Sequence, residues 1–489
     1  MSFTSQGFIL FLGLLFLAYY IVFRRWQWQC LLVASFIFYG FSAPGNLLYI
    51  TATIATTYLS TMKMLALGSE KRKRRPWLIG CLLINIGILA VLKYSGFVVG
   101  MITPKADPSF LHFAVPLGLS FYTFQSVSYL IDAYRGKKPD FIERNPFKLA
   151  LFISFFPQLI QGPISRFNDL RQTLFEPHGL CSEELSKGLF RVVFGLFKKL
   201  VVADRLLLSV RALVEKPEEY RGIYVLIVVA LYAVTLYADF TGGIDMTLGL
   251  SQMLGIKLKE NFNHPFYSKS IAEYWRRWHI TMGTWFRDYI FYPLSVSHFF
   301  LKLLKPCRRL FGQYVGGRFP VYIVTLITWF ATGLWHGASW NYIVWGVVNG
   351  VVILISQELT PLYKRFHNLL PALGRTRIYG AFQVIRTFWL MCFIRSFDIY
   401  ANVPLTLRMI GTVFTDITDS WIGMKPLGLS LVDALPVGIA IILMIMAGKW
   451  KPEKPAGLFS ACCILGVAIL VFGVYGFGYD MRNFIYEKF

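Results

Sequence analysis

The stretch GLWHGASWN, residues 333–341, places an ionisable imidazole at the end of an apolar run. His336 stands between Trp335 and Gly337, and the apolar run before it begins near Phe319. An ionisable residue at membrane depth is by default a candidate functional residue, because it is costly to bury in hydrocarbon. The alternative is a core histidine that serves only packing. The stretch thus indicates a potential base at or within membrane depth.

A second histidine, His279, has similar neighbours in EYWRRWHITMGTWFRDYIFYPL, residues 273–294. At about 100° per residue this segment predicts one amphipathic helix in the membrane interface, with arginines towards water or phosphate and His279 at the border. A core histidine is again the alternative. The aromatic stripe of this helix would contain Trp275, Trp278, Met282, Trp285 and Tyr289.

These two imidazoles are the best candidates for chemistry. In surroundings of low dielectric constant a histidine stays neutral and can accept a proton. The sequence has no GxSxG, HExxH, CxxC, GxxxxGK[ST] or GxGxxG motif, so no nucleophile set, metal site or bound cofactor is expected. Acyl transfer from a thioester to a hydroxyl needs only a base and a confined site, and therefore fits. The remaining histidines lie in loops or at span ends and need no special explanation: His112, His178, His264, His298 and His367.

The composition is that of an integral membrane protein. The chain has 489 residues, of which 56% are hydrophobic and 15% are charged, whereas soluble domains average about 25% charged residues. Apolar runs long enough to cross a bilayer recur along the chain. We expect one all-α polytopic domain over residues 1–489 with about ten to twelve spans. Its parts would be N-terminal spans (1–105), a catalytic core (110–350) and C-terminal spans (351–489).

The positive charge follows membrane topology. The net charge is +23, but the basic residues cluster between apolar runs, which the positive-inside rule explains better than nucleic-acid binding. Arg24–Arg25, Lys71–Arg75 and Lys449–Lys454 are the clearest cytoplasmic markers. They predict an extracytoplasmic N-terminus and a retained first span at about residues 6–23.

Three segments interrupt the pattern of spans. FFPQLIQGPISR, residues 155–166, is too short and broken to span and predicts a re-entrant or interfacial element that could line a cavity with Gln161. Residues 187–214 are basic and amphipathic, which predicts a helix along the cytoplasmic surface, facing either anionic lipid or an acidic carrier protein or nucleotide. Asp239 and Asp245 are expected to fix a helix break through local backbone hydrogen bonds.

Four motifs in order resemble the membrane-bound O-acyltransferase (MBOAT) family, specifically its bacterial alginate O-acetyltransferase branch. They are FFPQLIQGPISR, YADFTGGIDM, NHPFYSKSIAEYWRRWHITMGTWFRDYIFYPL and GLWHGASWN, within residues 110–350. The resemblance implies a helical bundle around a central tunnel, with His336 as the catalytic base and His279 in the same channel. It also implies a cytoplasmic thioester donor, acetyl-CoA or an acyl-carrier protein, and an extracellular or cell-wall polysaccharide acceptor, often reached through an SGNH-type partner.

On this interpretation the protein resides in the plasma membrane, and His279 positions a substrate or polarises the thioester carbonyl. Two alternatives stay open: D-alanyl transfer to teichoic acid by the same fold, and a transporter or flippase without acyl transfer. For the arginines, phospholipid headgroups are the alternative ligand. The further candidates for contact with substrate or donor are Trp335, Asn341, Trp278, Arg276, Arg277, Arg287 and Gln161.

Overall fold

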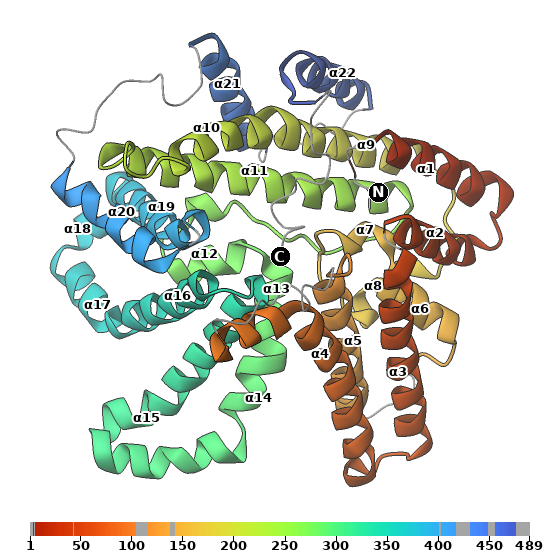
Figure 1. The fold of residues 1–489 in the computed structure, drawn as a ribbon, viewed down its shortest axis with the longest axis horizontal. Helices are drawn as coiled ribbons and strands as arrows, with labels where there is room; N and C mark the ends of the chain where they lie inside the picture. Colours follow the sequence, from red (N-terminus) through yellow and green to blue (C-terminus); the bar gives the residue numbers. More distant parts are fainter. Residues whose placement is uncertain are drawn as a thin grey trace. The chain divides into compact units, whose positions relative to one another are not determined.

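The computed structural model is 83% helical, and no strand occurs in the residues that it describes, which confirms the predicted all-α class. The described residues are 3, 5–42, 44–103, 115–136, 142–400, 402–416, 431–447 and 455–475. The predicted cytoplasmic marker Lys449–Lys454 and residues 417–430 lie outside these ranges. Figure 1 shows the arrangement of the helices.

Four described helices are long and apolar enough to cross a bilayer: α4 (Lys71–Ile102), α11 (Ile223–Met253), α15 (His298–His336) and α16 (Trp340–Glu358). Shorter apolar helices add to them, and the chain is a multi-pass membrane protein. Large apolar side chains face outwards, among them Leu83 at 69% and Phe414 at 81% exposure, as expected of a surface in lipid. The number of spans, ten to twelve, stays a prediction.

Residue contacts divide the chain into two units, and the three-part division expected from the sequence stays a prediction. The first unit comprises Met1–Val201, Asp239–Lys259 and Trp450–Lys488. Besides the C-terminal part of α11 it contains α4 and the following elements: α1 (Gln6–Leu17), η1 (Ala18–Val22), α2 (Gln27–Ser42), η2 (Pro44–Asn46), α3 (Leu47–Ala66), α5 (Leu119–Arg135), α6 (Pro146–Ser154), α7 (Phe156–Leu159), α8 (Phe167–Leu174), α9 (Ser182–Phe197), most of η5 (Lys198–Ala203) and α22 (Pro455–Phe472).

The second unit comprises Val202–Ala238, Glu260–Lys449 and Phe489. It contains the N-terminal part of α11, the helices α15 and α16, and the following elements: α10 (Asp204–Val214), η6 (Pro265–Tyr267), α12 (Ile271–Arg277), α13 (Ile280–Phe286), η7 (Arg287–Phe291), α14 (Tyr292–Ser295), α17 (Thr360–Leu369), α18 (Pro371–Gly374), α19 (Arg377–Ile399), α20 (Val403–Thr415) and α21 (Leu431–Ala447).

The helix break expected at Asp239 and Asp245 is wrong, because α11 continues through both residues to Met253. Asp239 pairs with Lys199 at 2.7 Å, and both side chains are buried. Asp245 pairs with Arg191 at 2.8 Å and with Lys198. The carboxylates therefore hold α11 to α9 and η5 through side-chain ion pairs, which local sequence could not reveal.

Two glycine pairs bring α9 and α11 into backbone contact. A Cβ atom added at Gly195 would lie 2.5 Å from the carbonyl oxygen of Gly242, and one added at Gly188 would lie 2.6 Å from that of Gly249. Small residues permit such close crossing of membrane helices. Lys198 and Lys199 pair with carboxylates of α11 and so do not belong to the basic surface predicted over residues 187–214. For the other residues that surface stays a prediction.

The segment 155–166 is too short to span, as predicted. Helix α7 has only four residues, and Gly162 follows with a φ of 86°, in the left-handed region that favours glycine. The segment is buried from Phe155 to Ser165. It is therefore a buried, irregular element within the first unit.

Helices α15 and α16 form a tight hairpin that positions His336 (Figure 1). Gly312 has a φ of 74° and divides α15 into two helical parts. Near the other end, a Cβ atom at Gly346 would lie 2.4 Å from the carbonyl oxygen of Trp329 and 2.9 Å from Cα of Gly333. The two backbones thus meet one turn before His336.

Substituting Gly346→Ala should separate the two helices, because the added methyl group has no space against Trp329 and Gly333. We expect a loss of about 1–3 kcal/mol, as is typical of overpacking, measured as a lower apparent Tm of the detergent-solubilised protein. Gly411→Ala in α20 is the control, since nothing lies within 4 Å of its added Cβ. An equal or higher Tm for Gly346→Ala would contradict the close approach.

Candidate active site

His279 occupies a sharp break between two short helices. The expectation of one amphipathic helix over residues 273–294 is wrong: α12 ends at Arg277, Trp278 is extended, and His279 has φ 44° and ψ 55°. Such a left-handed conformation costs a histidine about 1–3 kcal/mol and needs support from its surroundings. The site therefore begins with a local irregularity that helical periodicity did not predict.

An upstream segment supplies that support. The backbone N–H of Asn263 donates to the carbonyl oxygen of Arg277 at 2.9 Å, and the N–H of Ile280 donates to that of Asn261, also at 2.9 Å. These bonds replace the helical ones that the break removes. Residues 261–263 thus hold the chain open on both sides of His279.

The side chain of Asn261 binds the break as well. Its Oδ1 accepts hydrogen bonds from the backbone N–H of Thr281 at 3.1 Å and from its hydroxyl at 2.9 Å. Nδ1 of His279 lies 3.1 Å from the same oxygen. Asn261 and His279 are 0% exposed. The imidazole is therefore fixed in orientation inside the protein.

His336 is the last residue of α15 and lies between two indoles. Its ring centroid is 4.9 Å from that of Trp335 and 4.6 Å from that of Trp345 on α16, both edge-on. Gly337 follows because a Cβ atom there would lie 2.3 Å from the ring of Tyr342. The turn into α16 is held by Asn341, whose Nδ2 donates to the carbonyl oxygen of Phe397 at 3.0 Å.

Trp335 connects the two histidines. Its ring centroid lies 5.8 Å from that of His279 as well as 4.9 Å from that of His336. The two histidines come from segments 57 positions apart in the chain, and the structure brings both to one indole. Trp278, also predicted, is buried beside them and stacks on Tyr274 with centroids 5.6 Å apart.

The predicted arginines lie away from this buried cluster. Arg276 is exposed, Arg277 pairs with Glu273 at 2.7 Å, and Arg287 pairs with Asp288 at 2.8 Å. The structure does not bring their side chains to the histidines, and their contact with donor phosphates or lipid headgroups stays a prediction.

Gln161 belongs to the first unit. It is fully buried, and neither its Oε1 nor its Nε2 hydrogen-bonds to another described residue. Its amide lies against Gly243, where an added Cβ atom would be 1.7 Å from Oε1. The role of Gln161 in lining a cavity stays a prediction.

Sequence reasoning missed three residues of the second unit: Asn261, Arg395 and Asp398. Arg395 lies 4.2 Å above the ring of Trp278, donates to the Tyr274 hydroxyl at 3.1 Å and pairs with Asp398 at 3.4 Å. The signal was present as an i,i+3 pair of opposite charges in the apolar run MCFIRSFDI. Together with Asn341, which bonds Phe397, the C-terminal turn of α19 supports both histidine segments.

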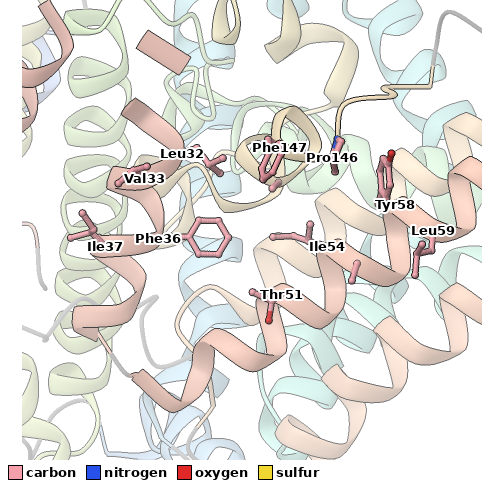
Figure 2. A pocket seen from close by; sticks show the side chains of 12 residues that line it. Leu32, Val33, Phe36, Ile37, Thr51, Ile54, Tyr58, Leu59, Pro146 and Phe147 are labelled. Atoms are coloured by element: carbon pink, nitrogen blue, oxygen red, sulfur yellow. The ribbon is translucent and has the colours of Figure 1, made fainter. Parts of the chain in front are cut away.

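One open groove of the first unit has an almost wholly apolar lining. It has a volume of about 790 Å³ and lies between α2, α3 and α6 of the first unit (Figure 2). Its lining is apolar except for Thr51 and Tyr58, whose hydroxyls bond the backbone oxygens of Leu47 and Arg144. Its lining residues include no histidine, cysteine or carboxylate.

Burial determines the protonation of His279, which lies outside the four membrane-length helices. Loss of hydration disfavours the imidazolium and lowers the pKa of His279 to about 3. The ring is therefore neutral at physiological pH and keeps one nitrogen lone pair. A neutral imidazole of this kind can accept a hydrogen bond through that lone pair.

Comparison with known proteins places these residues in context. The model of the family described as "MBOAT, membrane-bound O-acyltransferase family" matches residues 46–305, which include His279 and end before His336. A probable alginate O-acetylase of Pseudomonas aeruginosa is 34% identical over 366 residues, covering 73% of this chain and 66% of its own length. The chain thus spans just under two thirds of that relative.

Two further relatives are named for other activities. A peptidoglycan O-acetyltransferase of Helicobacter pylori is 30% identical over 407 residues, or 78% of this chain and 73% of its own. A teichoic acid D-alanyltransferase of Bacillus subtilis is 28% identical over 296 residues, or 59% of this chain and 69% of its own.

The neutral His279 predicts acid sensitivity. In the unfolded chain the imidazole binds a proton with a pKa near 6.5, whereas in the folded protein its pKa is about 3. Between these two pH values the unfolded state therefore binds more protons than the folded state. The free energy of unfolding that is present at pH 7.5 falls as the pH is lowered through this range. At pH 5 the free energy of unfolding should be about 2 kcal/mol lower than at pH 7.5, which would be measured as a lower apparent Tm.

His279→Asn should weaken this dependence, since asparagine tolerates left-handed backbone and does not titrate. The matched control is His264→Asn, because His264 has a φ of 47° but is only half-buried. Equal acid sensitivity in the wild type and His279→Asn would contradict the assignment.

The pair Arg395–Asp398 should behave as a buried ion pair. Replacing Arg395 alone with methionine leaves a buried carboxylate without its counter-charge, and we expect a loss of about 3–5 kcal/mol. The double variant Arg395→Met with Asp398→Leu serves as control and should recover part of that stability. If the double variant had a lower apparent Tm than the single one, loss of the ion pair would not be the main cause of the instability of Arg395→Met.

Proposed function

Because the chain belongs to the membrane-bound O-acyltransferase family, we propose that it transfers an acyl group, in the first instance acetyl, to hydroxyl groups of an extracellular or cell-wall polysaccharide. The observation that carries the proposal is the pair of buried imidazoles, His279 and His336, in contact with Trp335. Both O-acetylating relatives, which act on alginate and peptidoglycan by their names, support the polysaccharide class.

The reaction needs one base and no further nucleophile. His336 would take the proton of the acceptor hydroxyl as its oxygen attacks the thioester carbonyl. The new C–O bond forms, the C–S bond breaks, and the proton passes from His336 to the departing thiolate. Positioned base catalysis contributes about 10²–10⁴-fold, and confinement of both substrates supplies much of the remainder.

The other predicted residues have narrower roles in this scheme. Trp335 and Trp278 would form apolar walls, and Asn341 would act by holding the turn that carries His336. His279 would position a substrate or polarise the carbonyl. Gln161 is a candidate for polar contact with donor or acceptor, and Arg276, Arg277 and Arg287 for donor phosphates or lipid headgroups at the surface.

The donor, partners and location remain parts of the proposal. The donor would be acetyl-CoA or an acyl-carrier thioester arriving from the cytoplasm, and no permanently bound cofactor or metal is required. The protein would lie in the plasma membrane with its N-terminus outside, and would pass the group to an SGNH-type partner or directly to the polymer. Nucleic acid is not among its expected partners.

D-alanyl transfer to teichoic acid is the second candidate, supported by the Bacillus subtilis relative. Its lower identity and shorter match, 28% over 59% of the chain against 34% over 73%, favour O-acetylation. A transporter would need no catalytic base.

Mass spectrometry of surface polymers from cells with and without the protein distinguishes these functions. Polysaccharide O-acetyl esters that depend on the protein support the proposal. Esters of D-alanine on teichoic acid instead would select the second candidate, and unchanged acylation of all polymers would reject both.

Replacing His336 with alanine should abolish the acylation, because the hydroxyl then lacks its base. His298→Ala is the matched control: it removes an exposed imidazole from the first turn of the same helix and should leave acylation unchanged. Both variants should elute as folded protein in detergent. Wild-type acylation by folded His336→Ala would overturn the assignment of the base.

A further inference from the structure

The contacts of Asn261 narrow the role of His279. We propose that Asn261 is a positioning residue that fixes the tautomer of His279, so that His279 accepts a hydrogen bond from a substrate hydroxyl and does not donate one to the thioester carbonyl. This inference rests on the proposed function, where both roles were open. It follows from the directions of the hydrogen bonds that the buried Oδ1 of Asn261 makes with Thr281 and His279.

The first step is the orientation of the Asn261 amide. The backbone N–H of Thr281 can only donate, and it lies 3.1 Å from the atom assigned as Oδ1. Exchanging oxygen and nitrogen would place the amide NH₂ against this N–H, donor against donor, in a site with no exposure. The backbone therefore determines that the oxygen points towards Thr281 and His279.

The second step is the protonation of the imidazole. Nδ1 of His279 lies 3.1 Å from that oxygen. An unprotonated Nδ1 would direct its lone pair at the lone pairs of Oδ1, which is repulsive, whereas an Nδ1–H makes a hydrogen bond. A neutral imidazole carries one N–H only, so the lone pair is on Nε2.

The third step concerns what Nε2 can do. A thioester carbonyl needs a donor, which neutral His279 cannot provide from Nε2. A hydroxyl can donate to it. His279 and His336, in contact with the same indole, would thus both serve the hydroxyl, the former as a hydrogen-bond acceptor and the latter as the base.

Charged groups around His279 must be considered in any pH test. His336 shares Trp335 with it, and the pair Arg395–Asp398 adjoins Trp278. Further charged or titratable groups on neighbouring elements are Glu260, His264, Lys269, Glu273, Tyr274, Arg276, Arg277, Arg287, Asp288 and Tyr289. All of these groups are unchanged in the variants at positions 261 and 281 described below. A difference in pH profile between those variants therefore comes from the substituted residue.

The direct test is nitrogen NMR of the full-length protein in detergent, labelled with ¹⁵N in histidine. The His279→Asn variant identifies the signals of His279. We expect a protonated, pyrrole-type Nδ1 and an unprotonated, pyridine-type Nε2 at pH 7.5. A pyrrole-type Nε2, or two protonated nitrogens, would overturn the proposal irrespective of enzymatic activity.

The functional test compares Asn261→Asp with Thr281→Val. A carboxylate at 261 keeps the Nδ1–H tautomer and favours the imidazolium, which cannot accept a hydrogen bond. We expect Asn261→Asp to lose about threefold or more of its activity at pH 5.5 relative to pH 7.5, compared with the wild type. Thr281→Val removes only one donor to Oδ1 and should keep the wild-type pH profile.

The opposite result is equally informative. If His279 were a donor to the carbonyl, its imidazolium would be the better catalyst, and Asn261→Asp would gain activity at acid pH. Absence of acyl transfer by the wild type, with the expected NMR spectrum, would refute the proposed function and leave the tautomer standing. Normal acyl transfer with a pyrrole-type Nε2 would refute the tautomer alone.

Discussion

The ring of Trp335 contacts both imidazoles. The surrounding helices of the second unit must therefore hold two segments that are distant in sequence against the same indole. One histidine ends a long apolar helix, and the other lies at a break between two short ones. Neither could be placed by local structure alone. Each needs a neighbour that is distant in sequence to hold it against the indole.

The two placements are achieved by different physical means. His336 is placed by close packing, because Gly333 and Gly346 let the backbones of α15 and α16 come into contact. This contact restricts the movement of the helix end that carries His336. His279 is placed by hydrogen bonding, because Asn261 and Asn263 satisfy the backbone groups that the break would leave unpaired. Arg395 then covers the adjoining indole with a buried charge. Rigidity, and not charge on the imidazoles, is the common outcome.

Much of this could be predicted from sequence. Apolar runs predicted the helices, and tryptophan and glycine neighbours distinguished His279 and His336 from the other histidines. The break at His279 could not be predicted, because the tryptophans satisfy helical periodicity whether or not the helix continues. Asp239 was misinterpreted for a related reason: its partner Lys199 is 40 residues away. Asn261 gave no signal, since its role depends on a backbone N–H that only the fold brings near.

The kink at Gly312 sets the length of the helical part that ends at His336. From the kink to His336 the helix is roughly 36 Å long at about 1.5 Å per residue, close to the thickness of a bilayer with its inner interface. On the proposed function, the depth of the imidazole would then depend on the length of this helical part. A thicker or thinner bilayer would have to tilt the helix or move the imidazole to another level, and the acyl-chain length of the surrounding phospholipids would affect the proposed acyl transfer.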